Sequence, residues 1–381
     1  MSSTKKGKSG ILLPPAVGYS LGLFRKLIRE NDISPRYYFR VFAILLINLI
    51  NLPFRAYERK RINPSFADYP VNSEPVFIIG HWRSGTTYLH NLLSLDPQMG
   101  YVTTFQSVFP DTLFNIAGRW LFKTFTNLLI PGTRKGDNVV LDASLPQEEE
   151  FILGDRVPIS FYYFWMFPRN IETYYKRYIR FEGISTDEKE AWKKNYLLQI
   201  KKALKNTGGK RFLSKNPPHT GRIDVLLEMF PDAKFVYIRR NPVEVFLSTR
   251  HFFHMMMPNL RLHTISEKEI DEQIIALYKK LMNDYSDLKK LIPEKNLVEI
   301  SYEELEKKPT SVLKNIYTGL QLPGYDTAEP FFKSYIRQMR QYSKNVHTIK
   351  SSELKRILKE WDFAMEKYNR KVPENIVITD R

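Results

Sequence analysis

The sequence predicts an α/β fold with a mostly parallel central sheet flanked by helices. Three short runs carry this prediction, because residues 75–80, 234–240 and 297–302 are rich in β-branched and aromatic side chains, as buried parallel strands are. Helical patterns follow each run. Strands that alternate with helices favour a parallel sheet that is covered on both faces.

The helices expected beside these strands have recognisable starts and stops. Apolar residues recur at helical spacing from Thr87 until Asp96, where an Asp-Pro pair ends the pattern. A second helical stretch, residues 221–230, precedes the second strand. A further helix is expected to begin near Pro242, because proline suits a first helical turn.

The chain is expected to have three parts. Residues 1–10 are polar and basic and are predicted to be disordered, and residues 11–74 form a helical N-terminal segment. Residues 75–381 form the main domain, and within it residues 105–205, approximately, form a helical cap over the substrate site.

Composition limits the classes of partner. Lys plus Arg is 58 and Asp plus Glu is 41 among 381 residues, so the formal net charge of +17 points to nucleic acid, anionic lipid or a phosphate-rich cofactor. The basic residues are scattered along the chain, which argues against a nucleic-acid partner.

Cysteine is absent, which excludes disulfides, thiolate metal sites and cysteine nucleophiles. Residues 1–9 are not followed by a cleavable apolar core, so we expect a cytoplasmic protein without a signal peptide.

Residues 41–54 are the most apolar run in the sequence. At 14 residues the run is too short to span a bilayer alone, and Asn48, Asn51 and Pro53 interrupt it. Basic residues flank it on both sides: Arg36, Arg40, Arg55, Arg59, Lys60 and Arg61. The first expectation is a helix buried against the domain core. The alternative is peripheral membrane association through residues 36–61, with apolar side chains in the lipid boundary and arginines at the head groups.

The loop after the first strand has the features of an anion-binding turn. Residues 80–87 read GHWRSGTT, so glycines permit a tight turn and consecutive N–H groups at the helix start can surround an anion. The hydroxyls of Ser84, Thr86 and Thr87 add hydrogen-bond donors, and Arg83 adds a charged fork.

The loop departs from the nucleotide-triphosphate motif G-x-x-x-x-G-K-[ST] at one position. The spacing of Gly80 and Gly85 is kept, but Thr86 stands where the lysine belongs. A kinase-like enzyme would therefore need a cation from elsewhere. An ordinary glycine turn between strand and helix would also fit this loop alone.

A second candidate phosphate site follows the second strand. Arg240 is expected at the end of this strand, and Ser248 lies two turns into the next helix. Residues eight apart fall on one helical face, so both side chains can reach one phosphate near the carboxyl edge of the sheet. Either residue alone would equally fit a solvent-facing side chain.

Taken together, these stretches resemble the sulfotransferases that use 3′-phosphoadenosine 5′-phosphosulfate (PAPS), in particular a bacterial-type branch. RSGTT at 83–87 resembles the family's 5′-phosphosulfate loop, and residues 236–248 resemble its 3′-phosphate motif. SYEEL at 301–305 resembles the short motif whose tyrosine lies near the adenine. The resemblance implies that these residues bind the cofactor: Arg83, Ser84, Gly85, Thr86, Thr87, Arg240, Ser248 and Tyr302.

The same resemblance implies a P-loop-type fold and transfer of a sulfuryl group from PAPS to an acceptor hydroxyl. The spent cofactor is then adenosine 3′,5′-bisphosphate, and the family's reaction needs no metal.

Two departures from the family pattern affect the catalytic residues. Many cytosolic members have lysine where Arg83 stands. The soluble phenol and steroid enzymes carry Lys-Thr-His before the second motif, whereas residues 215–217 are Lys-Asn-Pro, closer to the Lys-Asp-Pro of the tyrosylprotein branch. The family's usual histidine is therefore missing from its place, and the general base must come from elsewhere.

We assign the expected catalytic roles accordingly. Arg83 holds the leaving phosphate, and Lys215 neutralises charge on the bridging oxygen or the sulfuryl group. Residues 148–150 are three glutamates beside an apolar run, and Glu149 is our choice among them for the base. Relatives with arginine in the loop use a glutamate base, although acidic residues in a first helical turn also simply complement the helix dipole. His90, one turn into the helix after the loop, is the rival base.

The expected acceptor is a small apolar molecule with a hydroxyl group, such as a sterol, lipid or phenol. Aromatic residues at 161–167 and methionines at 255–257 could line an apolar site, and they could equally be core. Two alternatives stay open: a P-loop kinase-like phosphotransferase, and a basic protein that binds a membrane surface or nucleic acid.

Overall fold

The computed structural model describes residues 16–129, 142–339 and 347–380. The chain divides into two compact units. Unit 1 consists of Met1–Asn72, Gly100–Phe212 and His254–Ser266, and unit 2 consists of Ser73–Met99, Leu213–Phe253 and Glu267–Arg381. The predicted disordered segment, residues 1–10, lies outside the described residues, and the predicted domain boundaries stay predictions.

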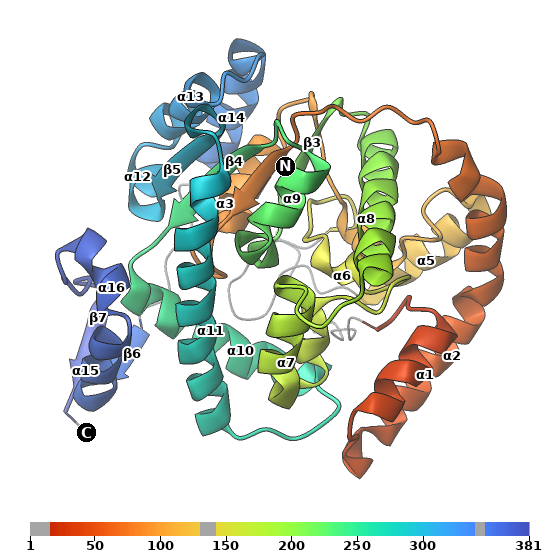
Figure 1. The fold of residues 1–381 in the computed structure, drawn as a ribbon, viewed down its shortest axis with the longest axis horizontal. Coiled ribbons are helices and arrows are strands. Elements are labelled where there is room, and N and C mark those ends of the chain that lie inside the picture. Colours follow the sequence, from red (N-terminus) through yellow and green to blue (C-terminus); the bar gives the residue numbers. More distant parts are fainter. Residues whose placement is uncertain (1–15, 130–141, 340–346, 381) are drawn as a thin grey trace. The chain divides into compact units, whose positions relative to one another are not determined.

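A five-stranded sheet organises unit 2 (Figure 1). The strand order is β2-β3-β1-β4-β5, with β1 paired in parallel to β3 and β4, and β4 paired in parallel to β5. The strands are β1 (Val76–Ile79), β2 (Met99–Gly100), β3 (Arg211–Lys215), β4 (Lys234–Arg239) and β5 (Leu297–Ser301). The predicted mostly parallel sheet is therefore confirmed, and the three predicted strands are β1, β4 and β5.

Side chains alternate between the two faces of β1, which is completely buried. Val76 and Ile78 join an aliphatic cluster whose other members come from the neighbouring strands and from α3 (Thr86–Leu93), α12 (Tyr302–Lys307), α13 (Pro309–Gly319) and α14 (Tyr325–Met339). Phe77 instead contacts the rings of Phe230 and Phe235, with centroids 6.3 and 5.5 Å away. Burial on both faces explains why β1 lacks polar alternation.

Unit 2 also contains further helices and a small C-terminal strand pair. They are α9 (Ile223–Met229), α11 (Glu267–Leu288), α15 (Ser351–Glu360), α16 (Asp362–Met365) and the parallel pair β6 (His347–Lys350) and β7 (Ile376–Thr379). Trp361 anchors the C-terminal part, because its fully buried ring stacks on Tyr278 of α11 at 3.9 Å between centroids. Helix α10 (Pro242–Leu260) begins where the sequence predicts.

Unit 1 is mainly helical. Its helices are α1 (Leu21–Glu30), α2 (Tyr38–Tyr57), α4 (Thr104–Val108), α5 (Ile116–Leu129), α6 (Glu150–Leu153), α7 (Ile171–Tyr174) and α8 (Thr186–Thr207). Helix α8 begins with a capping box in which Ser185 and Glu188 each satisfy the backbone N–H of the other. Most of the predicted helical cap falls in this set, and its placement over an acceptor stays a prediction.

The first expectation for residues 41–54 is wrong. These residues do form a helix, but α2 is longer than expected and only 22% of its most apolar window is buried. Its buried residues are Ile44, Asn48, Asn51 and Arg55, so most of them are polar or charged, whereas most of its large apolar side chains face outward. A helix of the domain core would have the opposite arrangement.

Candidate active site

The turn after β1 depends on a close approach between two strands. Gly80 has φ +143°, and a Cβ atom at this position would lie 2.4 Å from the carbonyl oxygen of Ile238 in β4. The Gly80 N–H donates to the hydroxyl of Thr220 at 2.8 Å. Glycine at position 80 thus lets the chain leave β1 directly beside the end of β4.

The loop then leads into the first turn of α3. Arg83 and Gly85 adopt left-handed conformations with φ of 68° and 92°. For Arg83 such a conformation costs about 1 kcal/mol, so the surrounding structure must hold it in place. Gly85 is the N-cap of α3, and the first N–H groups of a helix have no partners within the helix. The loop and this helix start form an anion-binding geometry.

The second predicted segment meets the loop directly. The Nε of Arg83 donates to the hydroxyl of Ser248 in α10 at 3.0 Å. Arg240 follows β4, which ends one residue earlier than predicted, and its Nη1 donates to the Arg83 carbonyl oxygen at 3.2 Å. The parallel pairing of β1 and β4 explains this meeting, because it places both strand ends at one edge of the sheet.

The groups around Arg240 favour its charged form. Burial alone would lower the pKa of its guanidinium, but the neighbouring Glu244 carboxylate, with Tyr302 and Glu303 contributing, outweighs burial and raises the pKa. Arg240 Nε donates to Glu244 Oε2 at 3.1 Å. A permanently charged, oriented fork is well suited to a phosphate group.

Tyr302 joins the third predicted motif to the other two. It is the first residue of α12, and the Arg240 guanidinium carbon lies 4.5 Å from its ring centroid. A Cβ atom on Gly85 would lie only 2.3 Å from the ring. The ring therefore packs directly on the Gly85 backbone, and the three motifs form one site within unit 2.

Three residues of this site were not predicted. Glu244 could have been found, because it lies four residues after Arg240 on a helix. Phe252, one turn after Ser248, lies with its ring centroid 5.0 Å from the Arg83 guanidinium carbon. Thr220 comes from a segment between other strands, and its spacing in the sequence gives no signal of its contact with Gly80.

Lys215 and His90 also belong to unit 2. Lys215 is the last residue of β3, is buried, and pairs in register with Ile78 of β1. His90 is completely buried in α3. Burial, and then the positive charge of Lys215, lowers the pKa of His90 well below its usual range. His90 is therefore neutral at physiological pH and is a weak base.

The three predicted carboxylates lie in unit 1 and differ in their contacts. Glu148 Oε2 accepts a hydrogen bond from the Tyr162 hydroxyl. Glu150 Oε1 accepts the Phe161 N–H at 2.6 Å. Glu149 is completely buried immediately before α6. The role of Glu149 as the base stays a prediction.

The described part of the chain contains no cluster of side chains that could hold a metal ion. Across residues 16–129, 142–339 and 347–380, no three His, Asp or Glu side chains gather so as to hold a metal ion. The expectation that the reaction needs no metal stays a prediction.

A parallel sheet with a glycine-containing turn between β1 and α3, and with Arg240 beside this turn after β4, has the arrangement of a P-loop-type fold. The chain belongs to the sulfotransferase family, whose model matches residues 75–327. The matched region contains all three motifs, and the protein is a PAPS-dependent sulfotransferase.

Similarity to individual sulfotransferases extends beyond this region. The omega-hydroxy-beta-dihydromenaquinone-9 sulfotransferases of Mycobacterium tuberculosis and Mycobacterium bovis are each 27% identical over 368 residues, which are 95% of this chain and 93% of theirs. Sulfotransferase STF1 of M. tuberculosis has a TM-score of 0.62 at 18% identity, covering 83% of this chain and 85% of its own. STF9 of Mycobacterium avium has a TM-score of 0.64 at 16% identity, covering 92% and 97%. The two solved structures share the fold.

We predict that Gly85→Ala weakens binding of adenosine 3′,5′-bisphosphate by at least about tenfold, because the new methyl group must displace the Tyr302 ring. Titration calorimetry would measure the change. Gly208→Ala is the matched control, since Gly208 has φ +80° but open space around its Cβ position. Both variants bear similar backbone strain, so equal affinities in the two would contradict the prediction.

Proposed function

We propose that this enzyme transfers the sulfuryl group of PAPS to the hydroxyl of an apolar, lipid-like acceptor. One observation carries the cofactor half of the proposal: Arg83 donates to Ser248 at 3.0 Å, and Arg240 donates to the Arg83 carbonyl oxygen at 3.2 Å. The 5′ and 3′ motifs therefore adjoin, as a nucleotide with phosphoryl groups at both ends requires. Family membership favours this function over the kinase-like and non-enzymatic alternatives.

The proposed binding mode assigns each motif to one part of PAPS. Residues 83–87 bind the 5′-phosphosulfate through loop amides, hydroxyls and the helix start. Arg240 and Ser248 bind the 3′-phosphate, and the ring of Tyr302 lies against the adenine. Support comes from the position of Arg240 and Ser248, which both contact Arg83 of the loop.

In the proposed reaction, the acceptor oxygen attacks sulfur in line with the leaving phosphate oxygen. The bond between sulfur and the bridging oxygen breaks as the new oxygen–sulfur bond forms, and the acceptor proton passes to a base. Arg83 and Thr87 stabilise the leaving 5′-phosphate. Lys215 offsets negative charge on the bridging or sulfuryl oxygens, which is consistent with its place at the carboxyl end of β3.

We assign the base to Glu149. Glu149 is completely buried immediately before α6, and a carboxylate beside the acceptor hydroxyl can accept its proton. His90 remains the rival, although burial followed by the charge of Lys215 lowers its pKa.

The acceptor class rests on the relatives. The mycobacterial relatives are named for a hydroxylated menaquinone derivative as their substrate, and the similarity covers 95% of this chain. The aromatic run at 161–167 supplies no support, because its side chains are buried and pack on one another, as Phe161 and Phe164 do at 4.9 Å between centroids. We therefore propose a hydroxylated isoprenoid-type lipid as the acceptor.

Purified protein with radiolabelled PAPS should sulfate a hydroxylated prenylquinone faster than it sulfates soluble phenols, because an apolar chain contributes about 0.8 kcal/mol per buried CH₂ group. Thin-layer separation of the labelled products would measure this preference. Labelling of polysaccharides alone, with no sterol, phenol or prenylquinone sulfated, would refute the acceptor class while leaving the sulfotransferase function intact.

We expect Arg240→Ala to raise the dissociation constant for adenosine 3′,5′-bisphosphate by about 10- to 100-fold, because hydrogen bonds to charged groups contribute about 1.5–3 kcal/mol each. The rate at saturating PAPS should fall much less. Arg239→Ala is the matched control, since Arg239 is the preceding residue and its guanidinium carbon lies 5.8 Å from the Tyr368 ring centroid. An unchanged affinity in Arg240→Ala would exclude the 3′-phosphate assignment.

Glu149→Gln should lower the rate by about 100-fold or more with cofactor affinity nearly unchanged, because glutamine preserves size but cannot accept the proton. Single-turnover kinetics and bisphosphate binding would separate the two effects. Glu148→Gln is the neighbouring control and should retain most activity. Full turnover in Glu149→Gln, combined with its loss in His90→Ala, would transfer the role of base to His90.

A further inference from the structure

Helix α2 exposes a continuous apolar stripe. Its outward side chains include Phe39, which is 82% exposed, and the remaining members are Tyr38, Phe42, Leu46, Leu49, Ile50, Leu52 and Tyr57. Steps of three and four residues connect most of them, which places them along one side of the helix. At 1.5 Å per residue the stripe runs for roughly 30 Å along the surface of unit 1. Isolated exposed apolar residues are ordinary, but a contiguous stripe of this length marks an interaction site.

The opposite face of α2 is polar and is fixed to unit 1. Asn48 accepts the Gly18 N–H at 2.8 Å and donates to the Ala16 carbonyl oxygen at 3.1 Å. One turn further, Asn51 accepts the Thr112 hydroxyl at 2.9 Å. These amide contacts satisfy polar groups that would otherwise be costly to bury.

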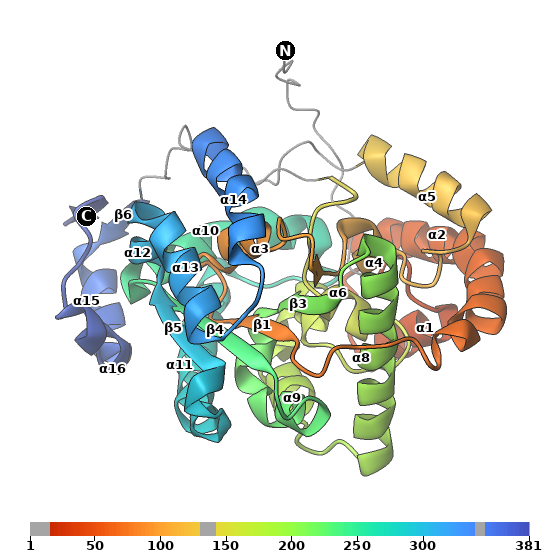
Figure 2. The ribbon, with the colours of Figure 1, turned by 90° about the horizontal axis from the view of Figure 1, so that it is seen from above.

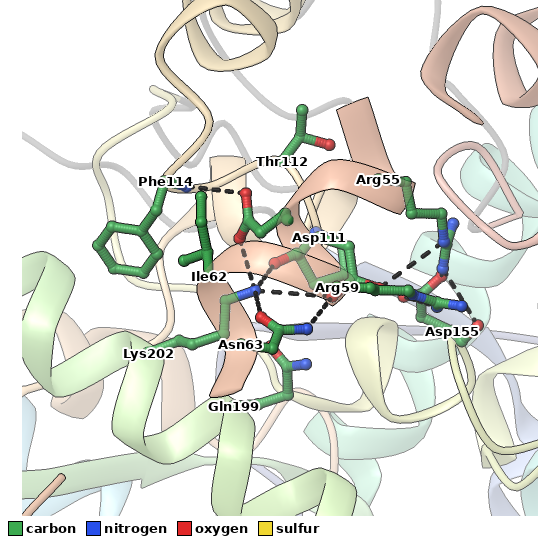
Figure 3. Close-up of polar contacts among 12 residues, drawn as sticks. Arg55, Arg59, Ile62, Asn63, Asp111, Thr112, Phe114, Asp155, Gln199 and Lys202 are labelled. Carbon is green, nitrogen blue, oxygen red and sulfur yellow. Dashed lines mark hydrogen bonds and ion pairs between the residues drawn. The ribbon is translucent and has the colours of Figure 1, made fainter. Parts of the chain in front are cut away.

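Charged contacts continue this polar face to the end of the helix (Figure 3). Arg55 pairs with Asp155, and the buried ammonium of Lys202 lies 2.7 Å from Glu58 Oε1 and 3.6 Å from Asp111 Oδ1. Burial would raise the pKa of Asp111, but the charges of Lys202, Arg59 and Arg55 outweigh it and lower this pKa far below its usual range. Separating these ions from one another would leave buried, uncompensated charges.

This polar face determines how α2 can meet a membrane. The helical run Pro35–Phe66 is long and apolar enough to cross a bilayer by length and composition. Crossing would require Asn48, Arg55 and Glu58 to leave their partners in unit 1 and enter hydrocarbon, at a cost of several kcal/mol per polar group. The structure therefore favours a helix that lies in the plane of the membrane surface.

Helix α5 extends the apolar surface. A Cβ atom on Gly118 would lie 3.0 Å from the Phe54 side chain, and the rings of Phe54 and Phe122 meet at 5.8 Å. On its other side, α5 exposes Ile116 and Trp120, which are 88% and 70% exposed. Tryptophan is the side chain that most favours the boundary between hydrocarbon and head groups.

The charges that border the stripe are positive. Arg36 lies exposed before α2, and Lys60 and Arg61 lie exposed after it. Glu58 is the only acidic residue between positions 36 and 61, and it is buried against Lys202. Anionic head groups would complement these cations, at a gain of about 1 kcal/mol for each basic residue near the surface.

We propose that α2 and the start of α5 form an in-plane docking surface for an anionic lipid bilayer. The apolar stripe enters the boundary of the acyl chains, and Arg36, Lys60 and Arg61 contact lipid phosphates. This inference goes beyond the sulfotransferase activity, because it concerns lipid binding by the protein without cofactor or acceptor. Charge complementarity and the apolar stripe together identify the lipid surface as the partner.

Sedimentation with vesicles tests the proposal without any activity measurement. The full chain should bind vesicles of phosphatidylcholine with 30% phosphatidylglycerol, and bind pure phosphatidylcholine vesicles at least about tenfold more weakly. The triple variant Phe39→Ser/Phe42→Ser/Leu46→Ser should reduce partitioning more than about a hundredfold. Phe331→Ser/Phe363→Ser, which changes exposed phenylalanines of unit 2, is the control and should bind as the unaltered protein does.

A second pair of variants isolates the charge. Lys60→Glu/Arg61→Glu should reduce binding to anionic vesicles at least about tenfold, whereas Lys307→Glu/Lys308→Glu, an equally exposed adjacent pair in unit 2, should not. Circular dichroism checks that each variant is folded. Absence of vesicle binding by the unaltered protein, or self-association in solution that the triple variant abolishes, would overturn the proposal. Resistance of bound protein to alkaline carbonate extraction would overturn the in-plane orientation.

Discussion

The parallel pairing of β1 and β4 is the constraint on which the cofactor site depends. Register pairs Ile79 with Tyr237, so the loop after one strand and the segment after the other start at the same edge of the sheet. The hydrogen bond from Arg83 to Ser248 and the one from Arg240 to the Arg83 carbonyl oxygen are consequences of that pairing. Arg83 is held in a left-handed conformation by the same contacts. One backbone arrangement therefore brings the segments after β1 and β4 together, and Figure 2 shows these two strands side by side.

Electrostatics differs between the cofactor site and the expected catalytic groups. Arg240 is a cation at physiological pH, as arginine is in proteins, and the neighbouring Glu244 carboxylate raises its pKa further. His90, in contrast, is buried near the cation Lys215, and both effects lower its pKa. A neutral imidazole beside a cation is a poor proton acceptor, which is why we assign the base to a buried carboxyl. Anion binding thus requires a cation, whereas proton transfer requires a group that can accept a proton, and a neighbouring cation makes this harder.

Helix α2 contacts the rest of unit 1 mainly through polar side chains and exposes apolar ones. The ion network around Lys202, Glu58 and Asp111 fixes the helix through its polar face, so the apolar stripe stays directed outward. An enzyme that acts on a lipid benefits from residence at the lipid surface, since the acceptor is concentrated there. The proposed docking surface and the proposed acceptor class agree in this respect, although each is tested by its own experiment.

Short contiguous patterns of apolar, glycine and hydroxyl residues were enough to predict β1, β4 and β5, the glycine-containing loop after β1 and the three motifs. Arg83, Arg240, Ser248 and Tyr302 could all be named from spacing and family resemblance, although not their mutual contacts. The contact of Glu244 with Arg240 could have been predicted from their four-residue spacing at the start of a helix, but it was not.

The buried face of α2 could not be predicted from its local sequence, because it depends on contacts with distant residues. The spacing of its apolar residues indicates a helix but not the partners of its polar side chains. Arg55 pairs with Asp155, and Glu58, just after the helix, pairs with Lys202. Both partners lie about 100 or more positions away in the sequence. The packing of Tyr302 on Gly85 and the contact of Thr220 with Gly80 are hidden for the same reason. Local patterns specify helices and loops, whereas contacts between distant residues depend on how the whole chain folds.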